Sequence, residues 1–201
     1  MSAPAPEVQS QGDGERLGRA PARAAVWRLR HAAVVLMFFA FSLNSDPGRI
    51  FNDTKIDLVL NPRAFLSRAV NLWDPLGSAG QLQNQAYGYL FPMGPFFWLG
   101  DAVGLPGWAT QRLWWGLLLT VSYTGFVVLS GRLGMARGWA RMVAGVAYAL
   151  WPLVLTVIGR SSVEVWPPAL APWILVPLVG LTARARPWRA AALSGLVILC
   201  L

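Results

Sequence analysis

The sequence predicts an all-α integral membrane protein, a bundle of apolar helices with interfacial helices in its first extracytoplasmic loop. Of the 201 residues, 55% are hydrophobic and only 13% are charged, which is typical of a membrane protein rather than a water-soluble domain. The basic residues give a net charge of +8, but they fall between long apolar runs instead of gathering in one polar segment. This distribution favours a role in membrane orientation, so no nucleic acid is expected as a partner.

The expected membrane spans are the long apolar runs of the sequence. They lie at about 29–44, 111–129, 139–158, 167–182 and 190–201. A helix needs about 20 apolar residues to cross the hydrocarbon core, and the last run is shorter, so we expect the sequence to be a fragment of a longer protein. Residues 1–28 are rich in Ala, Pro, Gly and Arg without apolar periodicity. They predict a disordered, basic cytoplasmic tail.

The arginines predict how these spans are oriented in the plasma membrane. Five of them precede or begin the first span, so the positive-inside rule places the N-terminus in the cytoplasm. Residues 89–103 are apolar but are interrupted by Pro92, Gly94 and Pro95, which disfavours a spanning helix. If this segment only lies in the interface, the two later three-Arg loops are also cytoplasmic. We therefore predict a multi-pass protein with one long extracytoplasmic loop at about 45–110.

The densest polar cluster, residues 46–57, begins where the first span ends. It contains Arg49, Asp53, Lys55 and Asp57. Charges at the edge of a membrane favour a functional interpretation. A carboxylate there can accept a proton from a sugar hydroxyl, and Arg49 or Lys55 can bind a phosphate leaving group. The cluster therefore fits glycosyl transfer from a lipid phosphate, and a simple solvated turn is the alternative.

A second acidic residue, Glu164, lies in the other expected outer turn, residues 159–166. It could face the first cluster across a cleft as a second acidic or substrate-binding group. Alternatively, it forms an ion pair with Arg160, four residues earlier, which would contribute only a few tenths of a kcal/mol. The sequence leaves both interpretations open.

Two further segments of the long loop could contact the membrane or a glycan. Residues 62–73 place apolar side chains at helical spacing, which predicts an amphipathic helix lying on the membrane or packed on protein. Residues 80–95 combine amide side chains with aromatic side chains. Amides hydrogen-bond hydroxyl groups and aromatic faces can cover a sugar or a polyprenyl chain, so the segment could contact either ligand. A structured loop without a ligand is the alternative. The candidate contacts are Gln83, Asn84, Gln85, Tyr87 and Tyr89.

These segments resemble the arabinofuranosyltransferase D family of mycobacteria and corynebacteria, alpha-(1->3)-arabinofuranosyltransferases that build cell-wall arabinan. The resemblance covers nearly everything after the tail, and its specific part is the long amide and aromatic run. The matching segments are residues 47–50 with 53–55, 83–97, 111–115 and 161–167. Family members are far longer, so residues 1–201 alone are not expected to be active.

The resemblance implies the N-terminal part of a GT-C glycosyltransferase fold, in which the first outer loop carries an acidic catalytic residue. By this analogy Asp53 is the base that deprotonates the acceptor hydroxyl. The implied donor is decaprenyl-phosphoryl-arabinofuranose, the acceptor is a cell-wall glycan, and direct displacement inverts the anomeric carbon. No Walker, H-E-x-x-H or G-x-S-x-G motif is present, so the sequence does not support the chemistries of soluble enzymes. We assign no metal ligands and no cofactor other than the lipid donor, and the requirement for a divalent metal stays open.

Two alternatives remain open at this point. The first is a different lipid-phosphate sugar transferase of the same fold, such as a mannosyltransferase. The second is a transporter or assembly subunit that binds lipid or glycan without chemistry. The donor that is used separates the first from arabinofuranosyl transfer, and the effect of Asp53→Asn separates the second.

Overall fold

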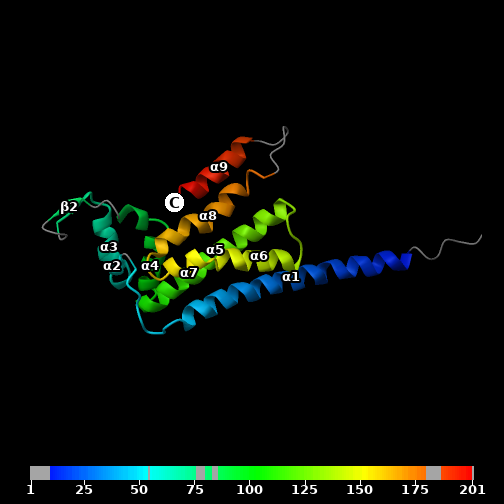
Figure 1. The fold of residues 1–201 in the computed structure, drawn as a ribbon, viewed down its shortest axis with the longest axis horizontal. Coiled ribbons are helices and arrows are strands. Elements are labelled where there is room, and N and C mark those ends of the chain that lie inside the picture. Colours follow the sequence, from blue (N-terminus) through cyan, green and yellow to red (C-terminus); the bar gives the residue numbers. More distant parts are fainter. Residues whose placement is uncertain (1–9, 54, 76–79, 83–85, 180–186, 201) are drawn as a thin grey trace, which may run out of the picture. The chain divides into compact units, whose positions relative to one another are not determined.

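The computed structural model describes residues 10–53, 55–75, 80–82, 86–179 and 187–200 and is almost entirely helical (Figure 1). The α-helices are α1 (Ser10–Asn44), α2 (Ile56–Leu60), α3 (Pro62–Ala69), α4 (Met93–Ala102), α5 (Gly107–Arg132), α6 (Trp139–Ala149), α7 (Pro152–Val157), α8 (Trp166–Leu175) and α9 (Pro187–Ile198). The short elements are the 3₁₀ turns η1 (Ala86–Tyr89) and η2 (Ser162–Val165) and the antiparallel strands β1 (Trp73–Asp74) and β2 (Gln81–Leu82). The predicted all-α fold is confirmed.

Helix α1 begins much earlier than the sequence predicted. We expected residues 1–28 to be disordered, whereas the described part of this segment is helical from Ser10 onward. The segment contains many Ala and Arg residues, which have high helix propensity, so it does not need apolar periodicity to be helical. The chain divides into two compact units, Met1–Met37 and Phe38–Leu201, and the candidate site lies wholly in the second.

Within the described residues, three segments are long and apolar enough to cross a membrane. They are Ala25–Asn44, Gly107–Arg132 and Gly138–Val157, and they coincide with the predicted spans 29–44, 111–129 and 139–158. The third is interrupted, because α6 ends at Ala149 and α7 begins at Pro152. Proline is well suited to the first position of a helix but cannot donate to the preceding turn.

The predicted span 167–182 is wrong as one continuous helix over its described part. Helix α8 has 10 residues and ends at Leu175, where residues 176–179 form turns. At about 1.5 Å per residue it is about 15 Å long, half of the roughly 30 Å hydrocarbon core. Pro177 lacks the backbone N–H that would continue the helical hydrogen bonds.

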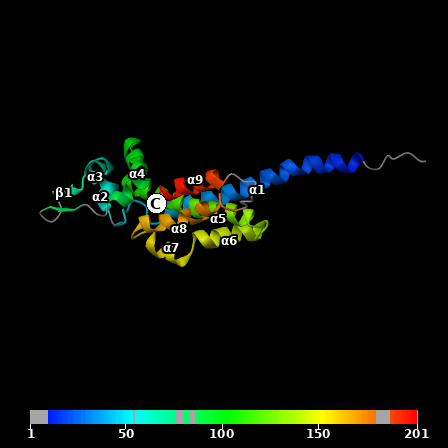
Figure 2. The same ribbon diagram turned by 90° about the horizontal axis from the view of Figure 1, so that it is seen from above.

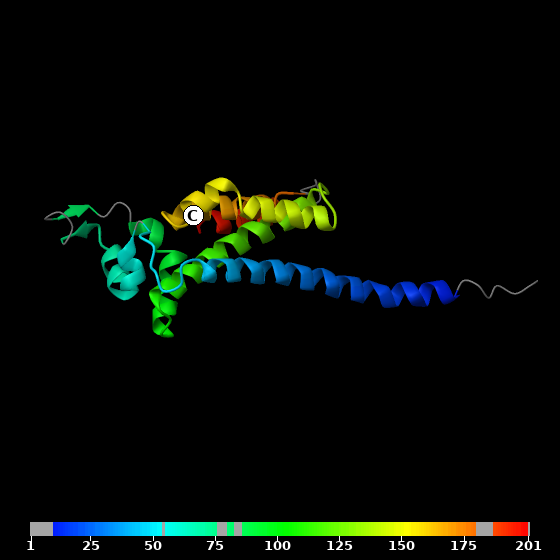
Figure 3. The ribbon, with the colours of Figure 1, turned by 60° about the horizontal axis from the view of Figure 1, so that its bottom comes forward.

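Helix α4 is the structured part of the ambiguous segment 89–103. It also has 10 residues and is therefore too short to cross a bilayer as one helix. It runs across the direction of α5 rather than along it (Figures 2 and 3). This geometry suits the predicted interfacial location of the segment.

Helix α3 is shorter than the amphipathic helix predicted over 62–73. Phe65 and Ala69 are buried as expected, whereas Val70 and Trp73 are 65% and 56% exposed. The helix ends at Ala69, and the side chain of Asn71 donates to the carbonyl of Ser67. Asparagine favours such local bonds over continuation of a helix.

Helix α5 is the central element of the second unit and packs against both α6 and α8. At the contact with α8, a Cβ on Gly125 would lie 2.6 Å from Nε1 of Trp173. That nitrogen donates to the carbonyl of Val121 at 3.0 Å, so the indole cannot easily move away. Small residues commonly allow such close helix contacts in membrane proteins.

We therefore expect Gly125→Ala to destabilise the full-length protein. Overpacking by one methyl group costs about 1–3 kcal/mol, which outweighs the gain of about 1 kcal/mol in helix propensity. The measurement is the apparent melting temperature in detergent. Gly195→Ala is the matched control, since a Cβ at this position would meet no atom within 4 Å and only the propensity gain applies. Equal melting temperatures for the two variants would contradict the packing argument.

Candidate active site

The carboxylate of Asp53 lies at the meeting point of two segments that are far apart in the sequence. It is 1% exposed and accepts hydrogen bonds from Ser162, which is 109 residues away. The backbone N–H of Ser162 donates to Oδ1 at 3.2 Å and to Oδ2 at 3.3 Å, and its hydroxyl donates to Oδ2 at 2.5 Å. The fold thus joins the predicted long outer loop and the predicted short outer turn directly at the candidate catalytic residue.

Ser162 begins the 3₁₀ turn η2, and Asp53 lies at the end of an irregular segment, residues 45–53, that follows α1. The backbone N–H of Asp53 donates to the carbonyl of Phe51 at 2.8 Å. Phe51 is held in turn by the side chain of Gln111 on α5, which accepts from its N–H and donates to its carbonyl, both at 3.0 Å. The position of Asp53 therefore depends on α5 as well as on η2.

The neighbouring residue on α5, Arg112, is fully buried beside the same segment. Its guanidinium donates to the carbonyl oxygens of Ser45, Asp46 and Arg49, at 2.8, 3.5 and 3.1 Å. It also lies over the ring of Trp115, 4.2 Å from the centroid. A cation inside an apolar helix calls for a functional explanation, and this signal was already visible in the sequence.

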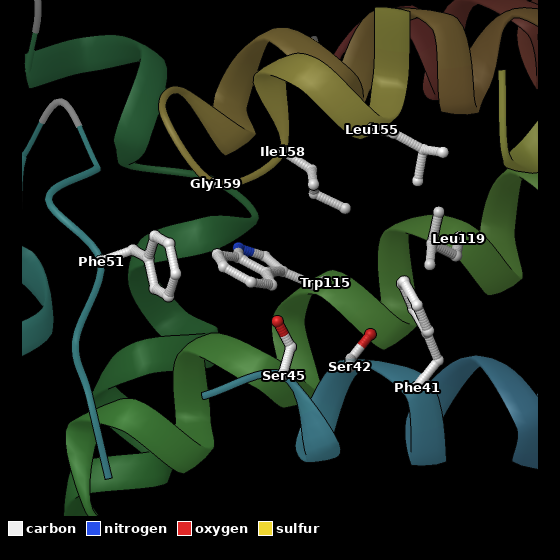
Figure 4. A pocket seen from close by; sticks show the side chains of 9 residues that line it. All are labelled: Phe41, Ser42, Ser45, Phe51, Trp115, Leu119, Leu155, Ile158 and Gly159. Carbon is white, nitrogen blue, oxygen red and sulfur yellow. The ribbon is translucent and has the colours of Figure 1, made fainter. Parts of the chain in front are cut away.

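A cavity of about 270 Å³ lies beside the segment that carries Asp53 (Figure 4). Phe51, Trp115 and Gly159 border one end of it, while Leu119 and Leu155 border the other. The rest of its lining is formed by Phe41, Ser42, Ser45 and Ile158. The lining is mainly apolar with two hydroxyl groups, a combination that suits a hydrocarbon chain next to a polar group.

The other charged residues of the 46–57 cluster lie in different surroundings from Asp53. Arg49 is exposed and Lys55 is half-buried. Asp57 is a candidate second acidic or substrate-binding group of the cluster, and its carboxylate accepts from Arg68 on α3 at 2.9 Å. This ion pair links α2 to α3, so Asp57 has a structural role in the described fold.

For Glu164 the sequence left two interpretations open, a group that faces the first cluster or an ion pair with Arg160. The turn does meet Asp53, but through Ser162, while the side chain of Glu164 is exposed. In the described part of the chain, no ion pair joins Glu164 to Arg160, which is also exposed. Residues 162–165 form a 3₁₀ turn rather than an α-helix, so the expected i, i+4 spacing does not apply.

The amide and aromatic run is only partly described. Gln83, Asn84 and Gln85 lie outside the described residues, and so does the side chain of Tyr87. Tyr89 is 4% exposed and packs against Phe65 of α3, with 6.2 Å between the ring centroids. Tyr89 is therefore a core residue in this structure and not an open glycan contact, because its ring is enclosed against α3.

In the segments that the structure describes, no group of three or more His, Cys, Asp or Glu side chains is arranged to hold a metal ion. The local chemistry consists of a buried carboxylate with a hydroxyl partner, nearby cations and an apolar cavity. These groups are suited to proton transfer from an alcohol and to binding an anionic lipid.

Comparison with known proteins gives consistent matches. Residues 37–201 match the family described as alpha-(1->3)-arabinofuranosyltransferase, N-terminal GT-C domain. The chain is 51% identical over 148 residues to the alpha-(1->3)-arabinofuranosyltransferase of Mycolicibacterium smegmatis, covering 74% of this chain and 10% of that protein. It is 47% identical over 163 residues to the protein of the same name from Mycobacterium tuberculosis, covering 79% and 12%.

Solved structures agree with these matches. The cryo-EM structure of the arabinofuranosyltransferase AftD from Mycobacteria superposes with a TM-score of 0.79 and 46% identity, over 85% of this chain and 13% of that chain. The chain thus spans about a tenth of the length of the relatives that it matches.

Proposed function

Because this chain belongs to the family of alpha-(1->3)-arabinofuranosyltransferase N-terminal GT-C domains, we propose that it forms the membrane part of an enzyme that extends cell-wall arabinan. The family assignment confirms the resemblance drawn from the sequence. The proposed donor is decaprenyl-phosphoryl-arabinofuranose. The observation that carries the proposal is the Asp53 carboxylate, hydrogen-bonded to a hydroxyl where the two loop segments meet.

The proposed reaction is a direct displacement with Asp53 as general base. Asp53 takes the proton of the acceptor hydroxyl, whose oxygen forms a bond to the anomeric carbon. The bond between that carbon and the phosphate oxygen breaks, decaprenyl phosphate leaves with the electron pair, and the anomeric configuration inverts.

Asp53 can reach an acceptor only if the Ser162 hydroxyl moves aside, because the carboxylate is 1% exposed. The Ser162 hydroxyl already donates to Oδ2, as the acceptor hydroxyl would. The acceptor therefore replaces one alcohol donor by another, and such an exchange preserves the hydrogen bonding of the buried carboxylate.

The donor is proposed to bind on the side of the neighbouring cations. Arg49 and Lys55 would hold the phosphate, because their side chains are exposed and half-buried, respectively, close in sequence to Asp53. The apolar cavity beside Phe51 would take part of the isoprenoid chain. Glu164, two residues after Ser162 and exposed, would contact the glycan acceptor.

The proposed orientation follows from the arginines. Arg132, Arg137 and Arg141 come at or after the end of the central helix α5 and mark this end as cytoplasmic. The loop with Asp53 precedes α5 and therefore lies outside the plasma membrane, while the N-terminus lies in the cytoplasm. The predicted glycan contacts Gln83, Asn84, Gln85 and Tyr87 then share the outer side with Asp53.

Donor choice tests the proposed function. Membranes that contain the full-length protein should transfer arabinose from decaprenyl-phosphoryl-arabinofuranose and should not transfer mannose from decaprenyl-phosphoryl-mannose. Product formation is measured with radiolabelled donors, and membranes with Asp53→Asn protein are the control. Transfer of mannose but not of arabinose would contradict the proposal and indicate a mannosyltransferase of the same fold. Binding of both lipids without transfer would indicate a non-catalytic subunit.

A further inference from the structure

Arg112 is a buried cation that has no part in the proposed reaction. It lies on α5, is 0% exposed and belongs to the segment 111–115 that carries part of the family resemblance. Among the described residues, its guanidinium donates hydrogen bonds to neutral oxygens, namely backbone carbonyls and the side-chain amide of Gln111. The guanidinium therefore faces backbone oxygens and is closed to solvent in this structure.

The geometry of these contacts suits arginine in particular. The guanidinium presents five N–H donors in a rigid plane, whereas a lysine ammonium is a compact group with three. Nε donates to the carbonyl oxygen of Ser45, and Nη2 donates to the carbonyl oxygens of Asp46 and Arg49. One side chain thus binds both ends of the turn that follows α1. The aromatic faces of Phe51 and Trp115, 4.6 and 4.2 Å from the guanidinium carbon, further stabilise the cation.

Gln111 extends this contact toward the carboxylate. Its Nε2 donates to the carbonyl oxygen of Phe51, the same oxygen that accepts from the N–H of Asp53. Its Oε1 accepts from the N–H of Phe51 and from Nη1 of Arg112. Two hydrogen bonds in series therefore connect α5 to the backbone of Asp53, and Gln111 also orients the guanidinium.

We propose that Gln111 and Arg112 are positioning residues for glycosyl transfer, which hold residues 45–51 against α5 and thereby place the Asp53 carboxylate. We call this pair the 45–51 clamp. The proposed effect of the clamp on catalysis rests on the proposed function, because the clamp acts through Asp53. The structural effect of the clamp, the restraint of residues 45–53, does not depend on the reaction.

The test uses the full-length enzyme with Arg112→Lys, which keeps the charge but loses the planar fork. We expect kcat to fall by about 100-fold, the size of effect that a misplacement of about 1 Å can produce, with little change in KM for the donor. Hydrogen exchange of peptides that cover residues 45–53 should become faster. Arg132→Lys is the matched control on the same helix, since Arg132 donates to the carbonyl of Val176, away from this segment, and should change neither quantity.

Gln111→Met is the second variant, in case Arg112→Lys does not fold. It removes both hydrogen bonds to Phe51 at similar side-chain volume, so exchange over 45–53 should again be faster and kcat lower. Unchanged exchange in the folded variants would overturn the clamp.

A double variant separates positioning from general stability. If the clamp acts through Asp53, adding Arg112→Lys to Asp53→Asn should cause no further loss of kcat. A loss of the same size in both backgrounds would overturn the positioning role. Should Asp53→Asn by itself retain full activity, the proposed base fails, and faster exchange in Arg112→Lys would still support the restraint of residues 45–53.

Discussion

Asp53→Asn in the full-length enzyme is expected to lower kcat by about 10²- to 10⁴-fold, the usual cost of losing a general base. Asparagine keeps the shape, and its Oδ1 can still accept from the N–H of Ser162 while its Nδ2 donates to the Ser162 hydroxyl, but it cannot take up the proton of the acceptor. The binding of the lipid donor should be retained, because the proposed phosphate contacts are Arg49 and Lys55. The measurement is the steady-state rate of arabinose transfer at saturating donor.

Asp57→Asn is the matched control for this result. It makes the same chemical change four residues later, in a carboxylate that forms a partly exposed ion pair with Arg68. Such pairs contribute about 0–1 kcal/mol, so activity should remain close to that of the wild-type enzyme. A large fall in kcat for Asp57→Asn together with a small fall for Asp53→Asn would indicate that Asp57, and not Asp53, is the general base.

Ser162→Ala is expected to lower the stability of the enzyme by about 1.5–3 kcal/mol, the contribution of a hydrogen bond to a charged group. The substitution removes the hydroxyl donor from a carboxylate that is almost fully buried and leaves the backbone donor in place. The measurement is the apparent melting temperature in detergent. Ser122→Ala is the control, because the hydroxyl of Ser122 is also buried but donates to the carbonyl of Leu118 in its own helix.

The catalytic effect of Ser162→Ala should be much smaller than that of Asp53→Asn. In the proposed reaction the acceptor hydroxyl replaces the Ser162 hydroxyl, so that group is not needed in the transition state. A fall in kcat as large as that of Asp53→Asn would instead make Ser162 part of the reaction.

The sequence by itself determined the membrane class and the family, and three of its five predicted spans coincide with the segments that are long and apolar enough to cross a bilayer in the described residues. The length and apolarity of a span are local properties that the bilayer selects directly, so they can be read without a fold. The resemblance in residues 83–97 is likewise local. By contrast, the breaks at Pro152 and after Leu175 lie at or next to prolines inside apolar runs. The prolines are visible in the sequence, but whether a proline ends a helix or is tolerated inside a span depends on whether neighbouring groups satisfy the freed backbone, which the length and apolarity of a run do not reveal.

Only the tertiary structure decided which residue faces Asp53. The sequence suggested Glu164, because charge is the visible feature of the second turn, whereas the hydroxyl and N–H of Ser162 make the contact. The burial of Tyr89 against Phe65 and the contacts of Arg112 with residues 45–49 were also decided by the tertiary structure, because the partners are distant in the sequence. Apolar periodicity reports which segments are buried, but the pairing of polar groups across 109 residues depends on the packing of α5 and η2 around one short segment.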